Sequence, residues 1–88
     1  MPYINPERRE RFSYALDLIS DELDSLSSGE VNYVVSEIVN DWVKSHETVS
    51  YRVLNEAHGT FYSAAAEFYR RVLVPFEEKA IERNGDIY

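Results

Sequence analysis

The C-terminal third of the chain carries an apolar pattern long enough for about ten turns of helix, and this length constrains the fold more than any motif does. The pattern advances in steps of three and four residues, through Leu54, His58, Phe61, Ala65, Phe68, Val72 and Phe76. Such spacing keeps the side chains on one side of an α-helix. We therefore predict a helix over about residues 49–83, ended by Asn84 and Gly85, a pair suited to a left-handed C-cap.

A first helix is predicted over about residues 6–26. Asn5 can cap its first turn, Pro6 suits the first helical position, and Glu7 complements the positive end of the helix dipole. Arginines lie early in this helix and acidic residues lie late, an order that opposes the dipole.

A second helix is predicted over about residues 29–44. Ser27 and Glu30 have the spacing of a capping box at its start. The β-branched residues within 31–35 also suit a strand, but no alternating partner strand occurs elsewhere in the sequence. The expected fold is all-α, with three helices in a single domain over residues 1–88.

Pro75 falls inside the long predicted helix. A proline removes one helical hydrogen bond and clashes with the carbonyl four residues earlier, so we expect the helix to be kinked or broken near this residue.

Two short helices cannot cover the whole apolar side of a long one. Either the long helix folds back at Pro75, or its free end packs on another subunit. The apolar pattern continues through Phe76, Ala80 and Ile81, which favours a helical homo-oligomer held together by this helix.

Composition excludes several classes of protein. The net charge of −7 disfavours DNA or RNA binding, for which a basic surface is expected. No stretch reaches the roughly 20 apolar residues of a membrane span, and no signal peptide is evident. We expect a cytoplasmic protein, located in the host cytoplasm if a phage encodes it.

The sequence offers little for catalysis, so we expect a protein that is not an enzyme and uses no cofactor. It contains no cysteine and no Gly-x-Ser-x-Gly motif. The histidines are His46, in a predicted loop, and His58, on the apolar side of the long helix. A histidine in that position is more typical of a core or an interface than of a catalytic site. No metal-ligand spacing is present.

Ligand binding is a better-supported possibility, because one flank of the long helix combines polar, aromatic and basic groups. These residues are Arg52, Asn55, Gly59, Tyr62, Tyr69 and Arg70. Tyrosines can stack on a base, asparagine can read its edge, and arginines can hold phosphates. Arg8 or Arg9 could close the site. The alternative is helix–helix packing across Gly59, with the tyrosines as interface anchors.

The opening residues 1–9 and the segments 67–72 and 75–88 carry a resemblance. With Asn32-Tyr33-Val34 and Leu54-Asn55-Glu56, they are similar to a family of short uncharacterised proteins from phage, prophage and bacterial genomes. The resemblance implies no activity for the family as a whole. In size, acidity and expected oligomerisation the chain also resembles phage anti-defence sponge proteins, which sequester nucleotide-derived signals between subunits.

Two functional hypotheses follow. In the first, a homo-oligomer sequesters a nucleotide-derived signal, of the cyclic ADP-ribose or cyclic dinucleotide type, at subunit interfaces and so blocks host immune signalling. In the second, the chain is a protein–protein interaction module that masks a host or phage protein. A polar cavity lined by arginine and tyrosine would favour the first, and a large exposed apolar surface would favour the second.

Overall fold

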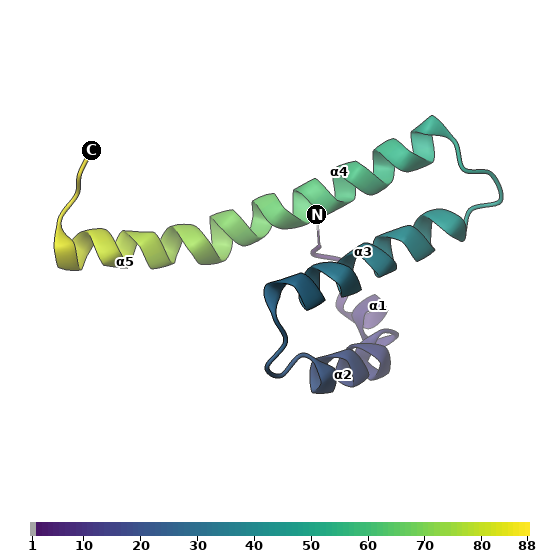
Figure 1. Cartoon of the computed structure of the whole chain (residues 1–88), viewed down its shortest axis with the longest axis horizontal. Helices are drawn as coiled ribbons and strands as arrows, with labels where there is room; N and C mark the ends of the chain where they lie inside the picture. Colours follow the sequence, from purple (N-terminus) through teal and green to yellow (C-terminus); the bar gives the residue numbers. More distant parts are fainter. Residues whose placement is uncertain (1) are drawn as a thin grey trace.

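A computed structural model describes residues 2–88 and is all-helical over that range. In chain order the elements are α1 (Pro6–Glu10), α2 (Ser13–Glu22), α3 (Ser28–Lys44), α4 (Tyr51–Phe68), the π-helical turn η1 (Tyr69–Leu73) and α5 (Val74–Asn84). The all-α prediction is therefore confirmed, and the stretch 31–35 that also suited a strand is helical. In Figure 1, α4, η1 and α5 form one long joined helix that extends well beyond the other elements.

The core lies between α3 and α4, which form an antiparallel hairpin (Figure 1). Among residues 2–88, the buried side chains are those of Val43, Val53 and Ala57, with Val39 packed against them. These are small aliphatic side chains, so the two helices can approach closely, but the apolar surface they bury is small.

Side-chain caps fix the starts of three helices. The Asn5 side chain accepts a hydrogen bond from the Glu7 amide, at 2.9 Å. Ser27 and Glu30 form both hydrogen bonds of the predicted capping box, at 3.2 and 3.0 Å. Ser50 caps α4 by accepting from the Val53 amide. The caps predicted at Asn5 and at Ser27 with Glu30 are therefore confirmed, whereas the cap at Ser50 was not predicted.

The first predicted helix, residues 6–26, is wrong in two respects, because the structure divides it and ends it early. The break falls before α2, where the Phe12 amide donates to the Arg9 carbonyl, a three-residue step that tightens the turn. The guanidinium groups of Arg8 and Arg11 both lie over the Phe12 ring, at 5.9 and 5.6 Å. At the other end, α2 stops at Glu22, and Ser25 adopts a positive φ of 65°.

The order of the charges disfavours one long helix over residues 6–26. Three arginines crowd the positive end of the helix dipole, and acidic residues crowd the negative end. Apolar periodicity alone predicted a longer helix than these charges allow.

The long helix is not broken at Pro75, which corrects one of the two outcomes expected from the sequence. The irregularity lies just before it, in η1, where the Val74 amide donates to the Tyr69 carbonyl five residues earlier. All residues flanking this turn keep right-handed helical angles. Pro75 follows this turn directly, and because the helix is continuous its missing N–H removes one helical hydrogen bond.

The π turn also keeps the apolar residues aligned. From Phe68 the pattern advances by four residues at each step, to Val72, Phe76 and Ala80. In a regular α-helix each such step overshoots a full turn by about 40°, so three steps would drift by about 120°. A π turn accommodates about one extra residue. It thereby cancels most of the drift, so that α5 presents its apolar residues on the same side as α4.

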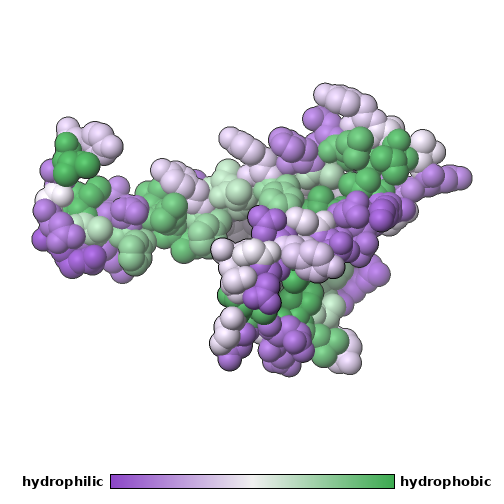
Figure 2. Space-filling model, viewed as in Figure 1, coloured by the Kyte–Doolittle hydropathy of each residue, from purple (hydrophilic) through white to green (hydrophobic). Residues whose placement is uncertain are grey.

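The single chain leaves much of its apolar surface uncovered. Its accessible surface is 8047 Å², whereas a folded protein of 10.3 kDa exposes about 5,400 Å². Its radius of gyration is 16.8 Å, against about 12 Å for a globular chain of this length. Figure 2 shows hydrophobic side chains along the projecting arm that carries η1 and α5. We call residues 69–84 the overhang.

The two chain ends behave differently. The Tyr3 hydroxyl donates to the Glu67 carboxylate at 3.0 Å, which ties the N-terminal segment to the end of α4. Ile87 is 86% exposed and Tyr88 is fully exposed, beyond the far end of α5. The N-terminal and C-terminal tyrosines therefore do not pack on each other in the single chain.

The contact between Tyr3 and Glu67 yields a pH prediction. The Arg70 guanidinium, and secondly the Tyr3 hydroxyl, hold the pKa of Glu67 below its usual range. A lowered folded-state pKa stabilises the fold above the unfolded-state pKa, and this contribution is lost as pH falls through the folded-state pKa. We expect Tyr3→Phe to raise the pKa of Glu67, measured by NMR titration of its carboxylate. The separate Arg70→Gln variant should raise this pKa by more, because Arg70 is the larger cause of the lowered value. An unchanged pKa in Tyr3→Phe would show that the N-terminal segment is not held on α4.

Candidate functional site

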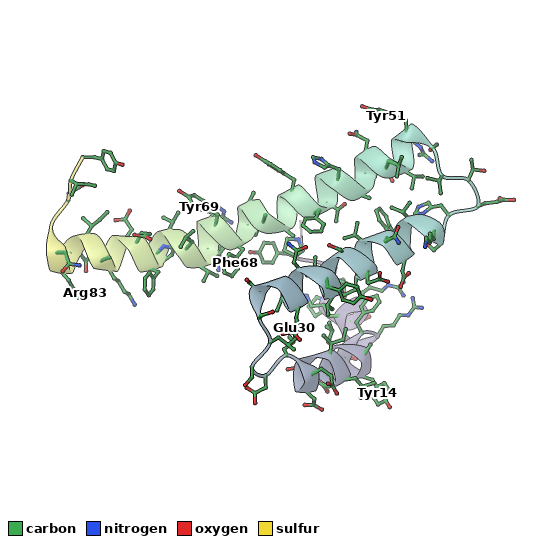
Figure 3. All side chains as sticks on the ribbon, viewed as in Figure 1. Tyr14, Glu30, Tyr51, Phe68, Tyr69 and Arg83 are labelled. Carbon is green, nitrogen blue, oxygen red and sulfur yellow. The ribbon has the colours of Figure 1, made fainter. Side chains whose placement is uncertain are left out.

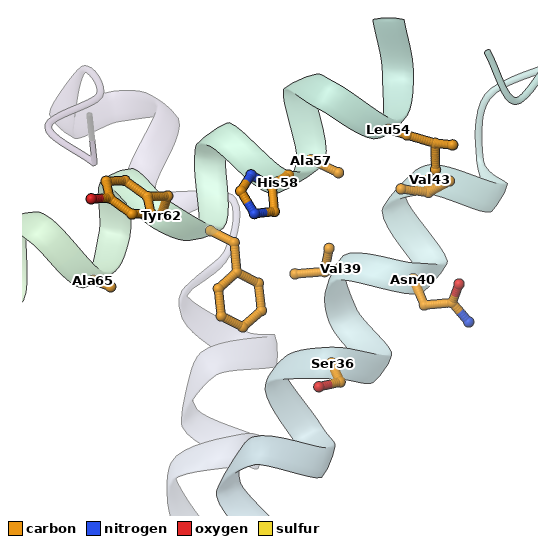
Figure 4. Close-up of a pocket in the computed structure, with 10 residues that line it drawn as sticks. Ser36, Val39, Asn40, Val43, Leu54, Ala57, His58, Tyr62 and Ala65 are labelled. Atoms are coloured by element: carbon orange, nitrogen blue, oxygen red, sulfur yellow. The ribbon is translucent and has the colours of Figure 1, made fainter. Parts of the chain in front are cut away.

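An open groove with a volume of about 490 Å³ lies between α3 and α4. We call it the α3/α4 groove. Its lining residues come from both helices: Ser36, Val39, Asn40, Val43, Leu54, Ala57, His58, Phe61, Tyr62 and Ala65. Figure 4 shows the α3 and α4 side chains on the two sides of this space. The groove forms because the contacts between the two helices are concentrated near their loop, where Val43 meets Val53 and Ala57.

The groove is mainly apolar, with a few polar groups. Its lining includes no charged side chain. His58 and Tyr62 contribute polar groups from α4. Asn40 of α3 also lines the groove, but in Figure 4 its amide points away from His58 and Tyr62. Ser36 also lines the groove, but its hydroxyl donates to the Asn32 side chain at 3.1 Å. Such a surface suits an apolar helix with polar groups along its edge better than it suits a phosphate.

The flank proposed for ligand binding runs along α4 and η1 and meets the groove only at Tyr62. Its residues are Arg52, Asn55, Gly59, Tyr62, Tyr69 and Arg70, and we call it the Gly59 flank. Gly59 is two residues from the buried Ala57, and two residues correspond to about 200° around a helix. The flank therefore points away from the core. Figure 3 shows Phe68 and Tyr69 projecting from different sides of the helix, with Tyr69 on the side away from α3.

The side chains of this flank are exposed and are not gathered into a pocket by the single chain. Tyr62 is 70% exposed and Tyr69 is 58% exposed. Tyr62 lines the edge of the α3/α4 groove. The Arg52 side chain reaches into solvent, 3.9 Å from Glu56 of the same helix. Asn55 is also exposed.

The arginines expected to converge on a ligand make other contacts. Arg70 pairs with the Glu67 carboxylate. Arg9 donates to the Ile4 carbonyl at 2.8 Å, in a hollow formed by the N-terminal segment, α1, α2 and Ile38 of α3. Arg8 lies over Phe12. Within the single chain, therefore, Arg8 and Arg9 do not close a site on the Gly59 flank.

Sequence reasoning missed the α3 side of the groove. Ser36 and Asn40 lie four residues apart, and with Val39 and Val43 they follow one side of α3. The sequence carries no distinct signal for them, because α3 has polar residues at many other positions, among them Glu37 and Asp41.

Neither a metal site nor a membrane segment is indicated in the part of the chain that the structure describes. Across residues 2–88, no three His, Cys, Asp or Glu side chains gather closely enough to hold a metal ion. None of the helices in the same range combines the length and apolar character that crossing a membrane requires.

The Gly59→Ala variant tests whether anything lies against the flank of α4 in solution. A Cβ added at Gly59 would meet no atom within 4 Å in the single chain. We expect Gly59→Ala to stabilise the helix by up to about 1 kcal/mol, and hence to raise the melting temperature by about 4–8 °C, measured by circular dichroism. The control is Gly85→Ala, which should destabilise because Gly85 has φ of 91°. A lowered melting temperature in Gly59→Ala would mean that another backbone or a ligand lies against this residue.

Comparison with known proteins gives a family but no activity. No curated protein and no solved structure matches the chain. A family model described as a domain of unknown function, DUF6899, matches residues 1–87. Since this match covers nearly the whole chain, the protein belongs to the DUF6899 family.

Proposed function

We propose that this chain is a small non-enzymatic protein–protein interaction module that acts through the α3/α4 groove and the overhang. The observation that carries the proposal is the extent of uncovered apolar surface on one joined helix. Phe68, Val72 and Phe76 are 61%, 52% and 65% exposed. Exposed apolar patches of more than a few hundred Å² are characteristic of surfaces that bind another protein.

The distribution of charge supports a protein partner over a nucleotide. A nucleotide pocket needs cationic or donor groups that converge on the phosphates. Arg52 extends into solvent, Arg70 is engaged by Glu67, and Arg9 is engaged by a backbone carbonyl. By contrast, the α3/α4 groove presents valine, leucine and phenylalanine side chains, which match the apolar side of an amphipathic helix.

Sequestration of a nucleotide-derived signal is the second candidate. It draws support from the volume of the groove, about 490 Å³, which is within the usual range for small-molecule sites. Asn40, His58 and Tyr62 at its edge could bond to and stack on a base. The phosphates would then need arginines from another subunit. In this case the protein would resemble the phage sponges in mechanism.

Native mass spectrometry of the protein purified from bacterial cells, before and after denaturation, distinguishes these two functions. We expect a complex made only of protein chains, from which denaturation releases no small molecule. The matched control is the Asn40→Ala/Tyr62→Phe variant. It removes polar groups at the groove edge while leaving the exposed apolar residues of the overhang unchanged.

Release of a phosphorylated molecule by the native protein, and its loss in that variant, would contradict the interaction-module proposal. The same result would establish the sponge. A protein that remains a monomer with neither partner nor ligand, at concentrations up to 100-fold above those in the cell, would contradict both.

A further inference from the structure

We propose that the α3/α4 groove is filled by α5 of a second copy of this chain, in an antiparallel pair in which each copy covers the groove of the other. The inference rests on the proposed function and names the partner of that same surface. Two apolar surfaces of the single chain are left uncovered. No third helix covers the α3/α4 groove, and no other helix packs against the end of the long helix. An antiparallel pair covers both at once.

The two parts have matching lengths. The groove follows α4 from Leu54 to Ala65, about 17 Å along the helix axis. Helix α5 has 11 residues and is also about 17 Å long. A parallel pair would place α5 against α5 and leave both grooves open. Only the antiparallel arrangement brings the overhang of one copy over the groove of the other.

The sequence of the long helix is self-complementary in one antiparallel register. In this register the two-fold axis passes between Phe68 and Tyr69. Each residue then faces the residue of the second copy that lies the same number of positions on the other side of the axis. Phe61 then faces Phe76 of the second copy, and Ala65 faces Val72. Both pairs are apolar, and the small Ala65 leaves room for close helix approach near the axis.

The π turn makes this register possible. It lies beside the proposed axis and keeps Val72 and Phe76 on the same side of the helix as Phe61 and Ala65. Without the turn, the apolar side of α5 would be rotated by about 100° away from that of α4. The same long helix could then not supply both the groove wall and the helix that fills the groove.

The polar edge of the groove also finds a counterpart. In the proposed register, Glu77 of the second copy falls between His58 and Tyr62. Glu77 is in the first turn of α5, and the groove lining contains no charged group of its own. A carboxylate placed there can accept hydrogen bonds from the imidazole and the phenol.

The surface available is sufficient for a stable pair. A standard protein interface buries about 800 Å² on each partner. The single chain exposes about 2,600 Å² more than a folded protein of its mass. In a two-fold pair each α5 fills the groove of the other copy, so no groove and no α5 remains free to bind a third copy.

Analytical ultracentrifugation tests whether this surface forms the pair. We expect the wild-type chain to sediment as a dimer, and Phe76→Glu to raise the dissociation constant at least ~100-fold, because it buries a carboxylate without a partner. The control is Glu78→Lys, which changes charge two residues away on the other side of α5. It should leave the dimer intact. A monomeric wild type, or a Phe76→Glu variant that still dimerises with wild-type affinity, would overturn the proposal.

Disulfide trapping tests the register, and the absence of cysteine in the natural chain makes it clean. In the Ala65→Cys/Val72→Cys variant, the two cysteines are about 10 Å apart along one helix, too far for a bond within the chain. They face each other between copies in the proposed pair. We expect covalent dimers on mild oxidation, seen on a non-reducing gel.

The matched control for trapping is Ala66→Cys/Arg71→Cys. These positions mirror each other about the same axis but point away from the groove, so no covalent dimer should form. Trapping of the control pair in preference to the first would overturn the register.

These results separate the pairing from the proposed function. A monomer that forms a stoichiometric complex with another protein would overturn the pairing and leave the interaction module standing. A trapped antiparallel dimer that releases a phosphorylated molecule would confirm the pairing and contradict the module.

Discussion

The contact of Val43 with Val53 and Ala57 is the constraint on which the rest of the structure depends. It sets α3 against α4 near their loop and leaves the helices free of each other farther along, which creates the α3/α4 groove. It also fixes where the long helix leaves the hairpin, and hence which residues project as the overhang. A core of three small side chains holds a hairpin but covers little apolar surface. The proposal that a further protein surface covers the chain rests on how little this contact buries.

Much of the fold could be predicted from the sequence, because helix starts and apolar periodicity are local properties. The boundaries of α3 and its capping box followed from Ser27 and Glu30, and the long C-terminal helix followed from its spacing. The first helix was predicted too long because periodicity does not register the opposing charges at its ends. The form of the irregularity before Pro75 was also missed. A proline signals that one hydrogen bond is lost, but it does not determine whether the helix kinks, breaks or inserts a π turn.

The candidate site could be predicted only in part, because it depends on how two helices sit against each other. Tyr62 was identified from the sequence and lies at the groove edge, and His58 was correctly placed on the apolar side of α4. Asn40 was missed, since its role appears only once α3 and α4 are placed side by side. The ligand-binding role given to Arg52, Asn55, Tyr69 and Arg70 stays a prediction that depends on a second subunit. Helical spacing reveals which residues share a flank, but not what faces that flank.

The π turn has a further consequence for how the chain can change by insertion and deletion. Because η1 contains about one residue more than a regular helical turn requires, removing one residue there would yield an ordinary α-helix with no loss of helical continuity. The apolar side of α5 would nevertheless rotate by about 100° relative to α4. A deletion that preserves the secondary structure would thus abolish the alignment of the surface. In this segment, the number of residues matters more than their identity.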